Sequence, residues 1–233
     1  MAAVTTEEQG DAFVIRFDDG KANALSPAAI AELSSAFEQA QEADGRVVVL
    51  RGREGMLSAG FDLKVMSSGP AAAAAMVQAG AELALQIYEF ERPVVVACPG
   101  HAIAMGAFLL LIGDARIGVE GSFRVGLNEV AIGMTLPEFG VVFARERLSK
   151  RYYERATLQA EMFAPGSARD AGFMDRVVPV EDLDTAVEQE VTRLAALHPA
   201  AFAGTRKRVR SAAAEEIREG LARDVSRITA MLG

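Results

Sequence analysis

The apolar segment 93–113 limits most strongly what this chain can fold into. Pro99 and Gly100 divide it, and the small residues after them are typical of a turn between a buried strand and a buried helix. His101 and the charged residues nearby argue against a membrane span. Such a turn can direct backbone N–H groups at an anionic ligand. A plain core strand and helix would give the same pattern, so the rest of the chain must decide.

Composition limits the classes of protein and partner. The chain has 233 residues, of which 51% are hydrophobic, enough for one sizeable core. Its formal net charge of −8 argues against a nucleic-acid partner. We expect Cys98 to be a buried, inert thiol, and the two histidines, His101 and His198, are too isolated to indicate a metal site. Residues 1–10 lack the pattern of a signal peptide, which predicts a cytoplasmic protein.

The hydrophobic patterns predict an α/β front part followed by a helical rear part. Ser26 and Pro27 mark a helix start, and Asp62 is placed to cap a short helix. The predicted strands are 12–17, 47–50, the residues before Pro99, 115–119, 122–125 and 177–180. The predicted helices are 27–43, 63–66, 70–92, the one after Gly106, 139–148, 150–161, a short one after Ser167, 182–197 and 212–232.

Two turns share one design, in which a buried strand ends in small residues and a helix begins. They lie at residues 58–62 and 104–106, and each can present one backbone N–H group. Two such donors on one carbonyl oxygen form an oxyanion hole, where each is worth about 3–4 kcal/mol. Glu129 lies in an apolar, glycine-flanked stretch, where burial would raise its pKa toward that of a general base. An acid on a surface loop is the alternative reading.

Taken together, several motifs resemble the crotonase superfamily, which includes enoyl-CoA hydratases and isomerases. They are Asn23–Ser26, Ser58–Leu63, Pro99–Gly106, Asp114–Ile117, Gly126–Glu129 and Ala168–Val178, in the family's order and spacing. The resemblance implies a spiral of ββα units over residues 1–175 and a C-terminal helical trimerisation region over 176–233. It also implies acyl-CoA thioester substrates, an enolate held by two N–H groups, a homotrimer or dimer of trimers, and no cofactor beyond the coenzyme A of the substrate.

The resemblance also implies roles for individual residues. The two backbone oxyanion donors fall on Phe61 and Met105. Met105 stands where the family usually has glycine, so a side chain that leaned into the pocket would narrow it. The expected coenzyme A contacts are Lys21, Ala22, Ala24, Ala59 and Lys64. The basic cluster 206–210 is either a further phosphate contact or, as we expect, a solvated helix face.

The acids indicate the reaction. Hydratases of the family use two glutamates, and the first position here is Phe108, whose ring cannot ionise or orient water. Glu129 remains, a pattern that resembles the mitochondrial type of 3,2-enoyl-CoA isomerase. We therefore expect an isomerase with Glu129 as its base. The alternatives are a hydratase in which Glu138 compensates, a hydrolase or decarboxylase, and a non-catalytic acyl-CoA-binding subunit.

Overall fold

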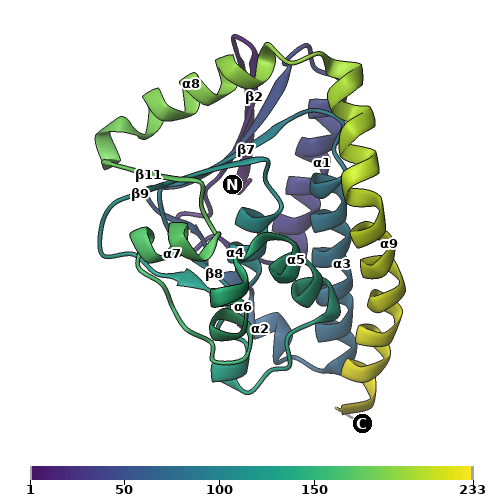
Figure 1. Ribbon diagram of the computed structural model, residues 1–233. Helices are drawn as coiled ribbons and strands as arrows, with labels where there is room; N and C mark the ends of the chain where they lie inside the picture. The colour runs from purple at the N-terminus through teal and green to yellow at the C-terminus, as the bar shows by residue number, and fades with distance from the viewer. Residues whose placement is uncertain (1, 232–233) are drawn as a thin grey trace.

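A six-stranded sheet forms the centre of the chain, which the computed structural model describes over residues 2–231 (Figure 1). Its strand order is β1-β2-β4-β7-β9-β11. The β1–β2 pair is antiparallel, and the other neighbours are parallel. The strands are β1 (Val4–Gln9), β2 (Ala12–Phe17), β4 (Val47–Gly52), β7 (Val94–Cys98), β9 (Ala115–Val119) and β11 (Arg176–Val178).

Two small parallel sheets, β10-β8-β5 and β3-β6, lie beside the large one. Their strands are β3 (Ala24–Leu25), β5 (Gly55–Ser58), β6 (Gly60–Phe61), β8 (Gly100–Ile103) and β10 (Val125–Gly126). Four times, after β2, β4, β7 and β9, the chain passes from the large sheet through a small sheet to a helix. This repetition confirms the expected spiral of ββα units.

Helices cover both faces of the large sheet. In Figure 1, α1, α3 and α9 run side by side on one face, and α8 crosses the other. The helices are α1 (Pro27–Glu42), α2 (Leu63–Met66), α3 (Pro70–Tyr88), α4 (Met105–Leu111), α5 (Glu138–Arg147), α6 (Lys150–Thr157), α7 (Pro165–Ala171), α8 (Leu183–Ala195) and α9 (Pro199–Met231). The short 3₁₀ helices are η1 (Val130–Ile132) and η2 (Val180–Asp182). One hydrophobic cluster lies on each face of the sheet.

The local signals of α1 show why the sequence adopts this structure. Pro27 is its first residue, and the Ser26 hydroxyl accepts a hydrogen bond from Ala29 N at 3.2 Å. Ile30, Leu33 and Phe37 are buried on one side of the helix. Asp62 caps α2 in the same way, accepting from Lys64 N at 2.9 Å. Both predicted helix starts are therefore confirmed.

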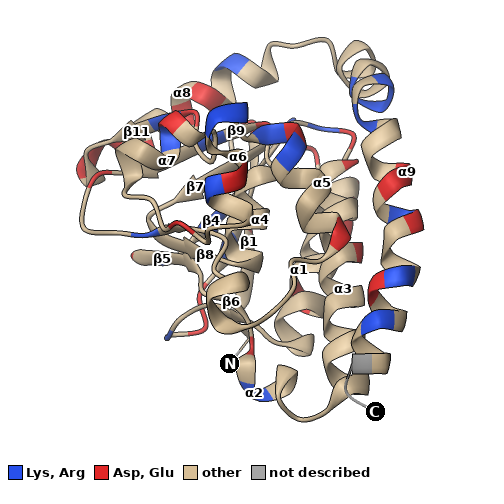
Figure 2. Ribbon diagram, turned by 60° about the horizontal axis from the view of Figure 1, so that its bottom comes forward, with Lys and Arg blue, Asp and Glu red and all other residues tan. Residues whose placement is uncertain are grey.

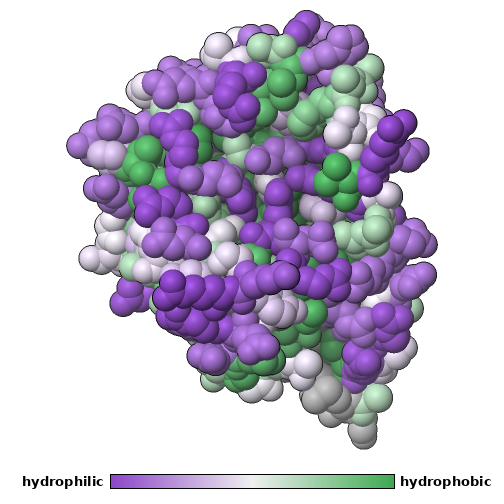
Figure 3. All heavy atoms as spheres, viewed as in Figure 1, coloured by the Kyte–Doolittle hydropathy of each residue, from purple (hydrophilic) through white to green (hydrophobic). Residues whose placement is uncertain are grey.

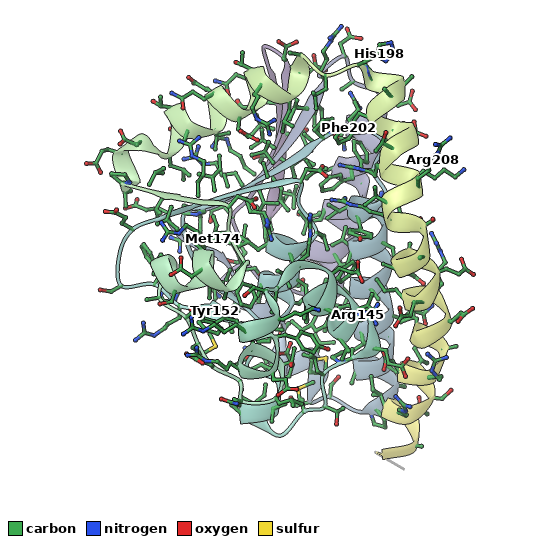
Figure 4. All side chains as sticks on the ribbon, in the orientation of Figure 1. Arg145, Tyr152, Met174, His198, Phe202 and Arg208 are labelled. Atoms are coloured by element: carbon green, nitrogen blue, oxygen red, sulfur yellow. The ribbon has the colours of Figure 1, made fainter. Side chains whose placement is uncertain are left out.

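The start of α9 and the basic cluster differ from expectation. The helix begins at Pro199 rather than at residue 212. The pattern of apolar residues did not predict the earlier start, because the first half of α9 has no apolar stripe and buries arginines instead. Arg206 and Arg210 both pair with Asp114, so they are neither solvated nor free for phosphate. Arg208 is exposed and points away from the body of the molecule (Figure 4). The solvated-face prediction was wrong for the two buried arginines.

Residues after 175 are integrated into the fold of their own chain. β11 extends the large sheet, α8 covers one face, and α9 packs along α3 and α5. Trimerisation through this region stays a prediction. The face seen in Figure 3 is mostly hydrophilic, with separate apolar spots. None of the helices described between residues 2 and 231 is long and apolar enough to cross a membrane.

Candidate active site

The first turn, at residues 58–62, is held by a buried asparagine. Asn23 has φ of 50°, and its amide donates to Phe17 O at 2.6 Å and Leu57 O at 3.1 Å. The Ser58 hydroxyl donates to Asn23 O at 2.7 Å and accepts from Gly60 N at 3.1 Å. These buried hydrogen bonds fix the path of the chain into β6.

Phe61 N–H points away from the small sheet. Asp62 N donates to Leu25 O of β3 at 3.2 Å. Since successive amide groups of an extended strand point in opposite directions, the preceding amide, that of Phe61, faces the other side. Phe61 N–H is therefore not used in the β3–β6 pairing.

The second turn, at residues 104–106, is strained. Ala104 has φ of 51° and ψ of −123°, a conformation that an L residue adopts only under constraint. Its N–H donates to Gly126 O at 2.9 Å, and its carbonyl accepts from Ala107 N at 2.8 Å. Met105 is the first residue of α4, so its N–H has no partner within the helix. The turn therefore offers one free donor at a helix N-terminus.

The two turns are in direct contact. A Cβ atom placed on Gly60 would lie 2.9 Å from Ala104 Cβ, 3.0 Å from Ile103 O and 3.3 Å from Met105 N. Glycine is thus required for this approach, and its φ of 91° also favours it. The fold brings the backbone amides of Phe61 and Met105 to one place.

The side chain of Met105 does not narrow this place. It is 1% exposed and belongs to the main hydrophobic cluster. A Cβ on Gly80, in the middle of α3, would overlap the Phe61 ring and lie 3.6 Å from Met105 Cε. Both side chains therefore turn toward α3, and glycine there makes room for them.

Glu129 is buried, three residues after Gly126, whose carbonyl accepts the hydrogen bond of Ala104 N in the second turn. The chain reaches Glu129 through β10, which pairs in parallel with β8. The carboxylic acid is 7% exposed, and burial raises its pKa to about 7, although its own backbone N–H opposes the shift. Its Oε2 has no hydrogen-bond partner among the described residues. A surface loop acid, the alternative reading from the sequence, is excluded by this burial.

Asn128 is a site candidate that sequence reasoning missed. Its Oδ1 is a second buried polar atom without a partner in the described part of the chain, next to Glu129. Buried polar atoms are normally satisfied, so neighbouring unsatisfied ones indicate a place where a ligand or water binds. An amide directly before the candidate base was the only signal in the sequence.

Phe108 and Glu138, the two positions considered for a second acid, are both unsuited to that role. The Phe108 ring is 1% exposed and packs edge-on against Phe139, with centroids 5.3 Å apart. The Glu138 carboxylate pairs with Arg223 and Arg227 of α9. Hydrogen bonding from Arg223 and the charges of both arginines lower its pKa, the opposite of what a general base needs.

The residues expected to contact coenzyme A lie in and next to the two-stranded sheet β3-β6. Ala59 N donates to Ala22 O at 3.0 Å, and Ala24 is the register partner of Gly60. Lys21 and Lys64 are exposed. Sequence reasoning missed Arg53, whose Nη1 donates to Lys21 O at 2.8 Å. Arg53 adds a cation to this region, although its Nε also pairs with Asp18 Oδ1 at 3.2 Å.

Other reactive groups take no part. Burial raises the pKa of the Cys98 thiol to about 12, and His101 Nδ1 accepts from Arg124 N at 3.0 Å. Within residues 2–231, no group of three or more His, Cys, Asp or Glu side chains is arranged to hold a metal ion. The candidates for chemistry at this site are therefore one buried acid, Glu129, and the backbone amides of Phe61 and Met105.

This constellation and the ββα spiral agree with the match to known proteins. The sequence model of the enoyl-CoA hydratase/isomerase family matches residues 7–231, and the chain belongs to this family. The crystal structure of an enoyl-CoA hydratase/isomerase family protein from Pseudomonas syringae is 40% identical, with a TM-score of 0.95 over 97% of this chain and 98% of that chain. The resemblance to the crotonase superfamily is confirmed.

Relatives with more specific names are of both kinds. Mitochondrial enoyl-CoA delta isomerase 1 from Homo sapiens is 28% identical over 208 residues, which span 88% of this chain and 69% of the relative. The crystal structure of an enoyl-CoA hydratase from Mycobacterium ulcerans is 36% identical, with a TM-score of 0.92 over 97% of this chain and 99% of that chain. The family is thus established, and the choice of reaction depends on the residues of the site.

Proposed function

We propose that this protein is a 3,2-enoyl-CoA isomerase, which moves the double bond of a 3-enoyl-CoA thioester to the 2 position. One observation carries the proposal: the site holds a single buried carboxylic acid with a raised pKa, Glu129, and a phenyl ring, Phe108, where a hydratase would carry its other acid. Moving a double bond requires one proton to leave C2 and one to reach C4. A single carboxyl group can do both in turn.

The geometry supports the following steps. The thioester carbonyl oxygen accepts hydrogen bonds from Phe61 N–H and Met105 N–H. Glu129, as carboxylate, takes a proton from C2, and the electron pair of that C–H bond delocalises over C1 to C4 as a dienolate. The two amides stabilise the negative charge on the oxygen. Glu129 then returns the proton to C4, which leaves the double bond between C2 and C3 and restores the carboxylate.

The lack of a second group that could activate water favours this reaction over hydration. The ring of Phe108 is locked between α4 and α5, since a Cβ on Gly140 would lie 2.5 Å from its Cζ. Neither it nor Glu138, held by arginines, can hold the nucleophilic water that hydration needs. A dry environment also keeps the proton on Glu129 for return to C4.

The coenzyme A part of the substrate is proposed to lie along residues Lys21, Ala22, Ala24, Ala59 and Lys64. Backbone groups at the alanines suit the adenine ring, and the exposed lysines suit phosphates. In this assignment the two turns bind the thioester, and the residues around β3 and β6 bind the coenzyme A. We further propose that the enzyme assembles as a homotrimer or a dimer of trimers.

The first test compares two substrates. Purified protein incubated with 3-enoyl-CoA is expected to produce the absorbance of a conjugated 2-enoyl thioester, because the double bond moves into conjugation with the carbonyl. With 2-enoyl-CoA, the absorbance is expected to stay constant, because no water is activated. Loss of absorbance from 2-enoyl-CoA at a comparable rate would instead identify a hydratase. Binding of acyl-CoA without either reaction would identify a non-catalytic binding protein.

The pH dependence tests the protonation state of the base. Because Glu129 must be ionised to take the C2 proton and its pKa is about 7, kcat/KM is expected to rise tenfold per pH unit below 7 and to level off above it. Steady-state rates with 3-enoyl-CoA between pH 5 and 9 measure this profile. A midpoint near pH 4.5, the ordinary value for glutamic acid, would show that Glu129 is solvated in the working enzyme or is not the base.

A further inference from the structure

We propose that Arg223, Asp224 and Arg227 of α9 are positioning residues that hold the loop of Glu129 by fixing Glu138 at the start of α5. The role as stated rests on the proposed function, since it concerns the placement of the proposed base. It makes the far half of α9 part of the working site, although none of these three residues touches the reacting atoms.

One face of α9 contacts the side chain of Glu138. Gly220, Arg223, Asp224 and Arg227 follow the spacing that places side chains on the same side of a helix. Arg223 Nε donates to both carboxylate oxygens of Glu138 at 3.1 Å, and Arg227 Nη1 donates to Oε1 at 2.7 Å. A Cβ on Gly220 would lie 2.8 Å from Glu138 Oε2 and 2.9 Å from its Cβ. The four residues therefore form a cradle for Glu138.

Asp224 supplies what α5 lacks. The N-cap residue of α5 is Pro137, and no side chain of its own segment caps the helix. Asp224 Oδ2 accepts from Glu138 N at 2.7 Å and so caps α5 from 86 residues away. The side chain is buried, and burial raises its pKa, while Arg223 and Arg227 favour its charged form. A buried acid used as a cap fixes both position and direction of the helix start.

The segment between Glu129 and Glu138 is short, and most of it is held in a hydrogen-bonded turn. Ile132 N and Met134 N donate to Glu129 O at 3.1 and 2.9 Å, so residues 129–134 form a compact turn. Only Thr135, Leu136 and Pro137 separate that turn from the cradle, and proline fixes its own φ. Val130 and Ile132 are 44% and 50% exposed, so η1 has little packing of its own. A restraint at Glu138 therefore passes to the main chain of Glu129.

A second ion pair joins α9 to α5 away from the cradle. Figure 2 shows basic and acidic residues alternating along the helix. Arg145, labelled in Figure 4, lies at the other end of α5 and pairs with Glu216 of α9. Glu219 adds an acid near Arg223. The Arg145–Glu216 pair joins the same two helices without touching the loop of Glu129. It therefore provides a matched control.

The test uses Asp224→Ala, Asp224→Asn and, as control, Glu216→Ala in the full chain. Two readouts are measured: kcat and KM with 3-enoyl-CoA, and hydrogen exchange of the Ile132 and Met134 amides. Asp224→Ala is expected to lower kcat about 10- to 100-fold with KM within about twofold, because small displacements of a base cost rate more than binding. Exchange at both amides is expected to be about tenfold faster. Asparagine retains an acceptor oxygen and is expected to restore both.

Several outcomes would overturn the proposal. Unchanged exchange at Ile132 and Met134 in Asp224→Ala, or faster exchange with unchanged kcat, excludes a positioning role, as do equal effects of Glu216→Ala. If Asp224→Ala does not fold, the double variant Arg223→Gln/Arg227→Gln takes its place with the same expectations. Absence of isomerase turnover in the unaltered protein contradicts the proposed function, whereas the exchange readout, which needs no turnover, still decides whether the cradle holds the loop.

Discussion

Replacing Glu129 with glutamine is expected to lower isomerase turnover by about 10³-fold, because general acid–base catalysis typically contributes 10²- to 10⁴-fold. Glutamine keeps the size and shape of the side chain but cannot take a proton from C2. Substrate binding is expected to persist, since in the proposed mechanism the Phe61 and Met105 amides hold the thioester and other residues hold the coenzyme A. The kcat with 3-enoyl-CoA and the binding of a saturated acyl-CoA measure the two effects separately.

The same substitution is expected to stabilise the fold at pH 8. Burial raises the Glu129 pKa from 4.5 to about 7, so the folded state holds its proton more tightly than the unfolded state. Stability is therefore present in full below pH 4.5 and falls as pH rises to about 7, by on the order of 3 kcal/mol. Glutamine does not titrate, so the variant avoids this loss.

Urea unfolding at pH 4.5 and pH 8 measures the change in the free energy of unfolding. Glu120→Gln, an exposed acid on the loop after β9, is the matched control and is expected to alter neither activity nor stability. Full activity of Glu129→Gln would eliminate Glu129 as the base. A variant no more stable than the unaltered protein at pH 8 would show that the Glu129 carboxylate is well solvated.

Replacing Asp114 with alanine is expected to destabilise the protein by about 3–5 kcal/mol, because it leaves two buried guanidinium groups without their counter-charge. Asp114 follows α4 and pairs with Arg206 and Arg210, whose side chains are 5% and 9% exposed. It also accepts from Val94 N at 2.7 Å, at the start of β7. One carboxylate thus joins α9 to the central sheet.

Urea unfolding of Asp114→Ala measures this loss, and Glu89→Ala provides the comparison. Glu89 pairs with Arg218 of α9 at the surface, where such pairs contribute at most about 1 kcal/mol. A double-mutant cycle with Arg206→Met separates the pair from the cost of the unpaired charge. A loss below about 1 kcal/mol for Asp114→Ala would show that water reaches the two arginines.

Local signals allowed most of the fold to be predicted from the sequence. The helix starts at Ser26 and Asp62 are encoded by side chains that cap their own helix, and β2 and β7 by short runs of apolar residues. The missed strand β1 is exposed along almost its whole length, so no hydrophobic pattern marked it. The early start of α9 was missed because buried arginines resemble a solvated basic stretch until their partner, Asp114, is located.

The candidate site divides in the same way. Glu129, Phe61 and Met105 stand in short motifs, and the structure brings the turns of Phe61 and Met105 into contact and buries Glu129. The fate of Glu138 was not predictable, since its partners Arg223 and Arg227 lie 85 and 89 residues further along the chain. Contacts over such separations leave no periodic pattern in the sequence.

Gly60 and Gly80 have a practical consequence for laboratory evolution of this enzyme. At both positions, the absence of a side chain leaves room that neighbouring groups occupy. At Gly60, even one methyl group would force the two turns apart. The two turns therefore cannot be adjusted one at a time by changes at these positions. Libraries aimed at new acyl-CoA substrates should keep both glycines constant and vary the exposed residues of η1 and α2, where Ile132 and Leu63 already face solvent.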